Sequence, residues 1–399
     1  MIDVPDIQKK YSPEMALIIL ICRVYLNKAQ SSDINNFLAG HTINWRFFSR
    51  IAAAHQIRPL IFKVLASGQF DVNPVFIEKL RKTCFNIATG NLHKSEELAR
   101  LNALFTNHGI TNFPYKGVIL SQYIFGDLIS RETADIDFVI EPSSFPLVYR
   151  LLLGEGYTAR YYNPAFERQI LSTSHELMFT KTTQKGILRV EVHWAATNNM
   201  MDIPLRNEAI FADPQVVSLS GNRVPTFNLQ NQLLVLLVHH GVNDVWRNLR
   251  HCLDITLFLE KAHDKIDWPK LHDATVKYRI RHTTEAGLMI SRQLFDGAVP
   301  SVFEQNGALP DFLLENLLRF PPLKKRKLNV ENLSQQLFLR DSLLDKLRLL
   351  ARYIKTGIQP NIRDMEANPL KAKWYFMYYF IKPYRIIFKR ETTARNEAS

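Results

Sequence analysis

Apolar residues in the first 110 positions recur at helical spacing. Residues 45–65 and 73–107 carry apolar side chains every three or four positions, the pattern of helices that pack one face onto a core. Ser12-Pro13-Glu14 is a typical helix start, because it combines a capping side chain, a proline in the first turn and an early acid. Residues 1–110 are therefore predicted to form a helical N-terminal region.

The pattern changes to short strand-like segments over residues 111–202. Two strands are predicted at 112–115 and 135–141, with a helix at 117–125 between them. Two more strands, 175–181 and 186–194, are separated by a turn-rich sequence and are expected to form a hairpin. This region is predicted to be an α/β core with a small mixed sheet.

The remainder of the chain is predicted to return to helices. Residues 203–228 contain Pro204, Pro214 and Pro225, and are predicted to be a linker or a long excursion. Residues 229–399 again place apolar side chains at helical spacing. The expected fold class is α+β, a small mixed sheet flanked by large helical regions on both sides in sequence.

The amino-acid composition indicates an expected cellular location and a class of binding partner. The content of 46% hydrophobic and 22% charged residues is typical of a soluble globular protein. The apolar run at 17–22 is too short to span a bilayer, and no signal peptide pattern is present. Three scattered cysteines indicate buried thiols in a reducing compartment, so the expected location is the cytoplasm. A net charge of +12 favours polyanions: nucleotides, nucleic acid or an anionic membrane.

Two aspartates stand two positions apart at the start of an apolar strand. In an extended strand Asp135 and Asp137 share one face, while Ile136, Phe138 and Ile140 share the other. Neighbouring carboxylates repel each other, and a hard divalent cation such as Mg²⁺ removes that cost. The pair is therefore a candidate for half of a metal site. The alternative is a polar strand end that faces water.

A candidate phosphate-binding turn precedes the aspartates. Lys116 and Gly117 lie between a short strand and a helix, where a glycine allows close backbone approach and a helix N-terminus favours anions. Lys116 adds a point charge, and Arg131 can add a forked contact to phosphate. The alternative for both cations is ordinary solvated surface.

The combined pattern K-G-x13-R-x3-D-I-D, followed by V-E-V-H-W, resembles the uncharacterised nucleotidyltransferase family of the DNA polymerase β-like superfamily. The resemblance extends over roughly residues 40–390 and includes a helical N-terminal region, an H-G…W…D helical segment and a basic-aromatic C-terminus. Many superfamily members carry Gly-Ser at the phosphate-binding turn, whereas here Val118 follows Gly117. The resemblance implies a nucleotidyltransferase core with a bound nucleotide.

Glu191 is the third carboxylate that the resemblance implies. On the predicted strand at 186–194 it faces the same way as Arg189 and His193. If the sheet brings this strand beside Asp135 and Asp137, three carboxylates can hold two metal ions about 3.5–4 Å apart for in-line phosphoryl chemistry. The alternative for Glu191 is an exposed residue paired with Arg189. His193 is expected to contact phosphate, to orient Glu191, or to be an ordinary strand-end histidine.

The segment after residue 229 carries a second polar cluster. Trp246, Arg250 and Asp254 recur every four residues, which predicts one helical face with an Arg250–Asp254 pair and a packed tryptophan. By resemblance, this face and His239-His240 approach the cleft and help to hold nucleotide or acceptor. Adjacent histidines on an α-helix point in different directions, so chelation of one metal by both is not expected.

Residues 371–390 interleave aromatic side chains with lysine and arginine. Three interpretations remain open: a final packed helix, which the resemblance favours, a helix on an anionic membrane, or a surface that stacks on nucleic acid.

The expected function is an enzyme. It transfers a nucleoside monophosphate from a nucleoside triphosphate, with ATP as the expected donor, to a hydroxyl of an unknown acceptor: a protein, nucleic acid, sugar or small molecule. Asp135, Asp137 and Glu191 are expected to bind Mg²⁺ and carry catalysis, while Lys116, Gly117, Arg131 and His193 bind substrate. One alternative is a non-catalytic module that binds nucleotide or polyanion. Another is a scaffold or membrane-surface protein that acts through residues 371–390.

Overall fold

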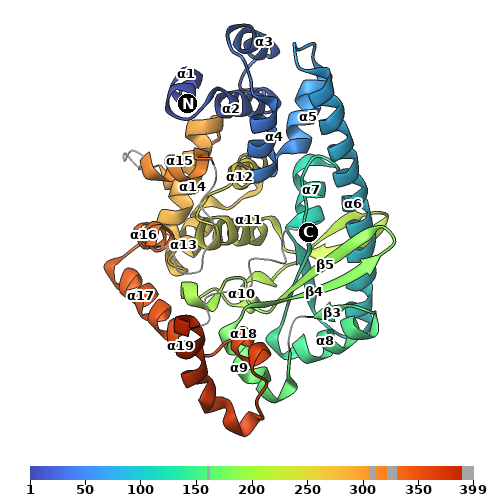
Figure 1. Ribbon diagram of the computed structural model, residues 1–399, viewed down its shortest axis with the longest axis vertical. Helices are drawn as coiled ribbons and strands as arrows, with labels where there is room; N and C mark the ends of the chain where they lie inside the picture. Colours follow the sequence, from blue (N-terminus) through green and yellow to red (C-terminus); the bar gives the residue numbers. More distant parts are fainter. Residues whose placement is uncertain (160–161, 305–310, 321–329, 389–399) are drawn as a thin grey trace.

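A mixed sheet lies between two groups of helices (Figure 1). The computed structural model describes residues 1–159, 162–304, 311–320 and 330–388. The N-terminal helices α1–α5 occupy one end of the molecule, and the C-terminal helices α18 and α19 lie at the opposite end. The long helix α6 (Pro74–Asn107) runs beside the sheet and connects the N-terminal helices to it.

The sheet has five strands within the described residues, in the order β1-β2-β5-β4-β3. Their bounds are β1 Asn112–Tyr115, β2 Ile136–Ile140, β3 Thr158–Ala159, β4 Glu176–Thr183 and β5 Gly186–His193. β2 and β5 are parallel, and the other neighbouring pairs are antiparallel, so the mixed sheet is confirmed. β1 lies at an edge, which suits Pro114 because proline cannot donate a ladder hydrogen bond.

One face of this sheet is apolar and is covered by helices. Ile136 and Phe138 on β2 and Val190 on β5 are fully buried with residues of α6 and α8 (Phe145–Gly154). Phe105 of α6 meets Phe138 edge-on at 5.2 Å between ring centroids. Side chains alternate along a strand, so burial of this face leaves the acidic positions on the other.

Among the other helices up to β2, three begin at the predicted positions: α2, α4 and α7. Ser12 caps α2 by accepting a hydrogen bond from the backbone amide of Met15. The segment predicted at 45–65 is two helices, because the chain turns at Gln56, where φ is 54°. The bounds are α1 Val4–Lys10, α2 Pro13–Tyr25, α3 Ser31–Gly40, α4 Trp45–Ala54, α5 Arg58–Ser67 and α7 Gly117–Phe125.

Among the helices from α9 onwards, the chain forms one irregular turn that the sequence pattern did not predict. Residues 238–243 form a turn of π-helix between α11 and α12. The bounds are α9 Glu167–Thr173, α10 Asn207–Ile210, α11 Leu229–Leu237, α12 Leu249–Ala262, α13 Trp268–Lys277, α14 Arg281–Phe295, α15 Asp311–Leu318, α16 Val330–Phe338, α17 Leu343–Ile358, α18 Ile362–Ala367 and α19 Tyr378–Phe388.

Helices from the two ends of the sequence share one hydrophobic core. Ile18 and Ile21 of α2 are buried in the same cluster as Ile290 and Leu294 of α14. The guanidinium of Arg23 also donates a hydrogen bond of 2.7 Å to the backbone oxygen of Leu294. The helical regions predicted separately at 1–110 and 229–399 are therefore in direct contact.

The segment predicted as a linker at 203–228 contains regular structure. It holds α10 and a hairpin formed by β6 (Gln215–Leu219) and β7 (Asn222–Thr226). The hydroxyl of Thr226 donates a hydrogen bond of 2.7 Å to the backbone oxygen of Pro114 on β1. The three prolines suggested an irregular path, but Pro225 lies at an outer position of a two-stranded sheet, which tolerates it.

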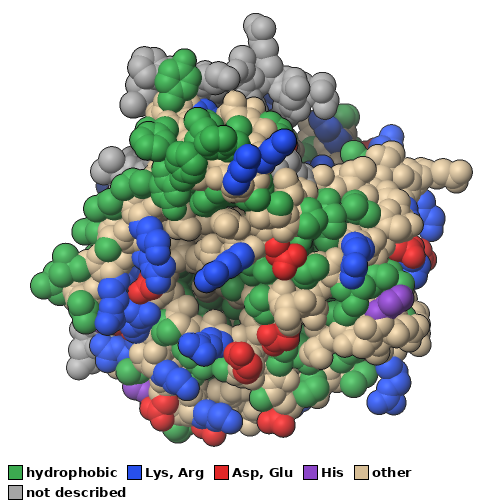
Figure 2. Space-filling view, turned by 90° about the horizontal axis from the view of Figure 1, so that it is seen from below, with side chains coloured by type: hydrophobic (Ala, Val, Ile, Leu, Met, Phe, Trp, Pro, Cys, Tyr) green, Lys and Arg blue, Asp and Glu red, His purple; other side chains and the backbone are tan. Residues whose placement is uncertain are grey.

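The C-terminal helices pack on one side and expose aromatic side chains on the other. Tyr378 and Lys382 of α19 are buried, and Arg385 forms an ion pair of 2.7 Å with Asp364 of α18. This supports the packed-helix interpretation for the contact side of α19, whereas Phe380 is 72% exposed. Viewed from this end, hydrophobic side chains gather with lysine and arginine between them (Figure 2). Residues 389–390 lie outside the described residues.

The cysteines and the lengths of the apolar helices were both considered at the level of sequence. Cys22, Cys84 and Cys252 are buried free thiols, as predicted. Among the described residues, none of the helices combines the length and the apolar composition needed to cross a bilayer.

Close packing between α14 and the turn before α12 predicts a specific loss of stability. A Cβ on Gly287 would lie 2.1 Å from Cζ2 of the buried ring of Trp246. We expect Gly287→Ala to lower the free energy of unfolding by about 1–3 kcal/mol or more, because the ring cannot move aside. Denaturant unfolding followed by circular dichroism measures the change.

Gly90 in the middle of α6 is the matched control. A Cβ there meets only the tip of Lys94 at 3.4 Å, so Gly90→Ala should raise the free energy of unfolding by about 0.5–1 kcal/mol. Equal effects of the two substitutions would contradict the packing argument.

Candidate active site

Three acidic side chains meet on the uncovered face of the sheet. In the parallel pair β2/β5, Asp137 lies in register with Glu191, so their side chains share a face. Asp135 immediately precedes β2 and belongs to the same face. All three line a cleft of about 560 Å³. The structure thus brings together the three carboxylates that the sequence singled out, although Glu191 is far from the aspartates along the chain.

The crowding of these acids shifts their protonation. Burial, together with the charges of Asp137 and Glu191, raises the pKa of Asp135 to about 6. Asp137 is more deeply buried, but Lys116 and His193 outweigh the effect of burial and lower its pKa. Asp137 is therefore the stable anion at the centre of the site, and Asp135 is the acid whose charge is least compensated.

Lys116 lies at the end of β1 and points at Asp137. Its Nζ is 3.0 Å from Oδ1 of Asp137, and its side chain is only 9% exposed. Burial opposes the charge of this ammonium group, but Asp137 outweighs it, so the pKa of Lys116 is raised. The backbone of Lys116 has φ 53° and ψ −147°, a strained region for a residue with a side chain.

Gly117 begins α7 with φ 39°, directly beneath the cleft. A Cβ there would lie 3.2 Å from the side chain of Thr133 and 3.3 Å from the backbone oxygen of Asp135. A side chain at position 117 would thus fill the space beside the aspartates. The glycine is thus required here for the chain's own packing, and the close approach of its backbone to a phosphate stays a prediction.

His193 is the next residue with a side chain on the acidic face of β5. Its Nε2 lies 3.1 Å from Oδ1 of Asp137 and 3.6 Å from Oε2 of Glu191. Burial lowers the pKa of this imidazole, but hydrogen bonds to Asp137 and Glu191 outweigh burial and raise it to about 9. At neutral pH His193 is therefore a cation between two carboxylates in the protein without metal.

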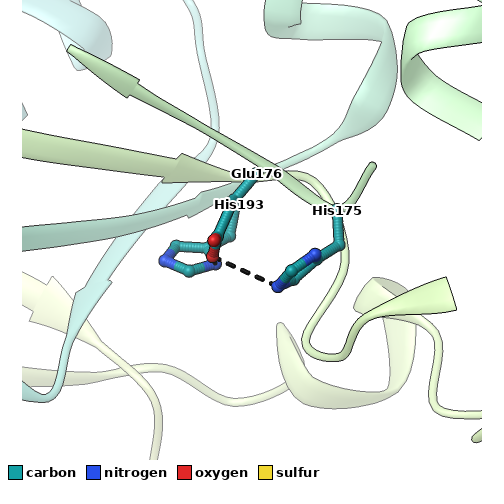
Figure 3. A group of neighbouring side chains, drawn as sticks. All are labelled: His175, Glu176 and His193. Carbon is teal, nitrogen blue, oxygen red and sulfur yellow. Dashed lines mark ion pairs between the residues drawn. The ribbon is translucent and has the colours of Figure 1, made fainter. Parts of the chain in front are cut away.

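Two residues missed from the sequence extend this group. Glu176 begins β4 and lies in register with His193 on β5, so their side chains meet across the hairpin. Figure 3 shows His175, Glu176 and His193 together, with Oε2 of Glu176 3.1 Å from Nε2 of His175. The same oxygen is 3.1 Å from Nδ1 of His193. Pairing of the predicted strands in register was the available signal for Glu176.

Arg131 reaches the cleft but is held by a partner from the helical region. Its Nε and Nη2 each donate a hydrogen bond of 2.9 Å to Asp254 on α12, and both side chains are buried. Burial raises the pKa of Asp254, but Arg131 outweighs it and holds the pKa well below the usual range. A further hydrogen bond of 3.3 Å joins Arg131 Nη1 to the backbone oxygen of Gly117.

The predicted Arg250–Asp254 pair is wrong. Arg131 and His240 already occupy the carboxylate of Asp254, and Arg250 instead donates a hydrogen bond of 3.0 Å to the backbone oxygen of Glu132. Trp246 is buried as expected, with its indole N–H bound to the oxygen of Thr283, but it precedes α12 and does not share that helix. Helical spacing did place Arg250 and Asp254 on one helix, α12, but the partners from other elements decided which charges pair.

His239 and His240 line the wall of the cleft opposite the carboxylates, together with Arg247, Arg250 and His251. The expectation that the adjacent histidines diverge is wrong, since their Nδ1 atoms are 3.3 Å apart. They lie in the π-helical turn at 238–243, which is wider than an α-helical turn and changes the direction of neighbouring side chains.

Other histidines and aromatic residues near the site have structural roles. Nδ1 of buried His55 accepts a hydrogen bond from the backbone amide of Leu249. The indole N–H of Trp194 donates to the backbone oxygens of Leu171 and Ser174. Both residues are less than 5% exposed, as expected for side chains that pack in the core.

Comparison with known sequences decides the family. A family model described as "Uncharacterised nucleotidyltransferase" matches residues 41–296, which include β1–β5 and α12. The chain belongs to this nucleotidyltransferase family. The match contains every acidic and basic residue of the cleft described above.

A solved structure has a related description. An antigenic nucleotidyltransferase-like protein from Paracoccidioides brasiliensis is 15% identical to this chain, with a TM-score of 0.31. The similarity covers 43% of the present chain and 76% of the other. Among curated proteins, none has a sequence that matches this chain.

The buried Arg131–Asp254 pair predicts a strong dependence of stability on both partners. Removing the carboxylate in Asp254→Ala leaves an uncompensated buried guanidinium, so we expect a loss of about 3–5 kcal/mol in the free energy of unfolding of the protein. Denaturant unfolding measures this loss. The double substitution Arg131→Met with Asp254→Leu should recover a large part of it, because no charge remains buried. A double variant less stable than Asp254→Ala would contradict this explanation.

The electrostatics of His193 predict a pH effect in protein freed of metal by a chelator. The raised pKa means that His193 contributes stability fully below about pH 6.5, and this contribution is lost as the pH rises through about 9. Asp137→Asn removes the anionic hydrogen-bond partner and should lower the pKa of His193. Histidine proton NMR titration measures it, with His193→Gln to assign the signal and Asp273→Asn, on exposed α13, as control. An unchanged titration in Asp137→Asn would refute the assignment of the shift to Asp137.

Proposed function

We propose that this protein transfers a nucleoside monophosphate from a nucleoside triphosphate, with ATP as the expected donor, to a hydroxyl of an acceptor. The observation that carries the proposal is the parallel register of Asp137 with Glu191, which places three carboxylates on one face of a cleft in a member of a nucleotidyltransferase family. The mixed sheet supports this arrangement because its other face is apolar and fixed against α6 and α8.

The residues present fit a hard divalent cation. Carboxylate oxygens are the ligands that Mg²⁺ prefers, and Asp135, Asp137 and Glu191 supply them in one place. In the protein without metal, Lys116 and His193 provide the positive charge that Asp137 requires. Bound Mg²⁺ would neutralise the triphosphate and lower the pKa of the acceptor hydroxyl.

Other groups around the cleft are suited to bind the triphosphate and to hold the carboxylates in place. The bare backbone at Gly117 and the N-terminus of α7 receive phosphate oxygens, and Lys116 supplies a charge beside them. Arg131 holds the oxygen of Gly117 and adds positive charge to this turn. His193 holds Asp137 and Glu191 in place.

In the proposed transfer step, the acceptor oxygen forms a bond to the α-phosphorus of the triphosphate. The bond from that phosphorus to the bridging oxygen breaks, and pyrophosphate leaves. The hydroxyl proton passes to a site carboxylate or to water.

Pyrophosphate release tests this proposal. With ATP, Mg²⁺ and a cell extract as the source of acceptors, we expect Asp137→Asn to reduce the rate by at least about 10²–10³-fold, because it removes the central metal ligand. Asp273→Asn on exposed α13 is the matched control and should retain the rate.

The alternative, a non-catalytic binder of nucleotide or polyanion, gives a different result. It predicts no release above a blank, together with nucleotide binding that falls steeply with salt and does not require Mg²⁺. Equal release by the original protein and Asp137→Asn would overturn the enzyme proposal.

A further inference from the structure

The wall opposite the carboxylates contains a group of nitrogen and oxygen ligands. Nδ1 of His239 lies 3.3 Å from Nδ1 of His240 and 3.5 Å from Oδ2 of Asp244. One ligand atom from each of these three residues lies within 4.8 Å of the others. These side chains line the same cleft as Asp137 and Glu191 but belong to the helical region.

We propose that His239, His240 and Asp244 bind a divalent transition-metal ion, with Zn²⁺ the best fit, in a site separate from the three carboxylates. Zinc bonds to imidazole nitrogen and carboxylate oxygen are about 2.0–2.2 Å long, which makes neighbouring ligands in a tetrahedron about 3.3–3.5 Å apart. The separations of His239 from His240 and from Asp244 already have this value, whereas His240 and Asp244 lie within 4.8 Å and would move closer together around the ion.

The hydrogen bonds around the ring of His240 are those typical of a metal-binding histidine. Metal-bound histidine usually donates its other ring N–H to a carboxylate, which fixes the ring and its tautomer. Nε2 of His240 lies 3.2 Å from Oδ2 of Asp254, and Asp254 is held in turn by both ends of the Arg131 fork. The Nδ1 of His240 is thereby left to face His239.

A second contact fixes the same ring from the side. The ring of His251 stacks on His240 with centroids 4.2 Å apart and an angle of 12°. Nε2 of His251 is also 3.6 Å from Oδ2 of Asp244, so it orients the carboxylate. Because two stacked rings cannot direct lone pairs at one ion, His251 is a positioning residue here and not a ligand.

The backbone explains why consecutive histidines can serve together. The π-helical turn at 238–243 places them side by side, and such turns are frequent at functional sites. Three protein ligands leave a fourth position, which is the arrangement of zinc sites that also bind water or substrate. The side chain of His239 is 23% exposed, so this position opens to the cleft.

The chemistry of the two sites separates their metals. Asp135, Asp137 and Glu191 offer oxygen ligands, which suit Mg²⁺, whereas two imidazoles and one carboxylate suit Zn²⁺. The cleft would then hold a hard ion on the sheet and a borderline ion on the helical wall. The zinc site does not depend on the proposed transferase activity.

Zinc binding to the untagged full-length chain tests the proposal. The protein is stripped with a chelator, supplied with excess Mg²⁺ to occupy the carboxylates, and titrated with ZnCl₂ by calorimetry. We expect one equivalent to bind, and at least about 100-fold weaker binding in His239→Gln and Asp244→Asn, since even the loss of a supporting residue costs 10–100-fold. Visible absorption of Co²⁺ in place of Zn²⁺ reports tetrahedral coordination independently.

Two further variants locate the ion. His263→Gln removes a half-exposed histidine outside the cleft and should bind zinc normally. Asp137→Asn should also bind normally, because it alters only the carboxylate site. Circular dichroism establishes that each variant is folded, and partly exposed His239→Gln decides the result if Asp244→Asn does not fold.

Three outcomes would overturn the proposal. The first is no zinc binding by the original protein, and the second is equal binding by His239→Gln. The third is loss of binding in Asp137→Asn, which would place the ion among the carboxylates. Nucleotide and pyrophosphate are absent from the measurement, so its failure is distinguishable from failure of the proposed transferase activity.

Discussion

Crowded negative charge on one face of the sheet is the constraint on which the rest of the structure depends. Asp135, Asp137 and Glu191 would repel one another, because Asp137 is buried and the other two acids are partly buried where they line the same cleft. Lys116 and His193 compensate for Asp137 at 3.0 and 3.1 Å, and the raised pKa of Asp135 shows that compensation is incomplete. A site with an unmet need for positive charge is suited to bind cations, as we propose.

The same constraint accounts for features that would otherwise be costly. The strained backbone of Lys116 directs its ammonium group inward to Asp137 and not along the surface. Strain of this kind costs about 1–3 kcal/mol and persists where the surroundings hold it. Gly117 then follows with no side chain, because one would lie against Thr133 and Asp135. Charge compensation and the open cleft are thus arranged by two consecutive residues.

The two walls of the cleft are connected by a buried network. Arg131 belongs to the core region, Asp254 to α12 and His240 to the π-helical turn, and they bind one another in that order. Charges buried in this way require complete hydrogen bonding, so the relative position of the walls is closely specified. This network therefore sets the distance between the carboxylates of the sheet and the proposed zinc ligands.

Much of the local structure could be predicted from sequence because its causes are local. The strand at 112–115 and the helix at 117–125 have the predicted bounds, and Pro74 and Gly109 bracket the long helix α6. Alternation along β2 and β5 also predicted which side chains would face together. The division of 45–65 into two helices was missed, although Pro59 in the first turn of α5 was an available signal. The left-handed backbone at Gln56 itself has no strong signature in a residue other than glycine.

The site was only partly predictable. Asp135 and Asp137 could be recognised by their spacing, and Lys116-Gly117 by its position before a predicted helix. Glu176 and Asp244 could not be recognised, because their neighbours come from other parts of the fold. Strand register brings His193 to Glu176, and the π-helical turn brings His239 to Asp244. The pairing of Arg131 with Asp254 could not be anticipated either, because the nearer Arg250 offered a simpler partner at helical spacing.

By itself, the sequence determined which side chains share a face, where several helices and strands begin, and that a lysine-glycine turn and an arginine precede the paired aspartates. These features depend on backbone periodicity and on neighbours a few residues away. Only the tertiary structure decided that β5 lies parallel to β2, that Arg131 belongs to Asp254, and that two adjacent histidines face each other. Such contacts join residues 14 to 123 positions apart or depend on one irregular turn, and their free energy comes from burial that no local pattern encodes.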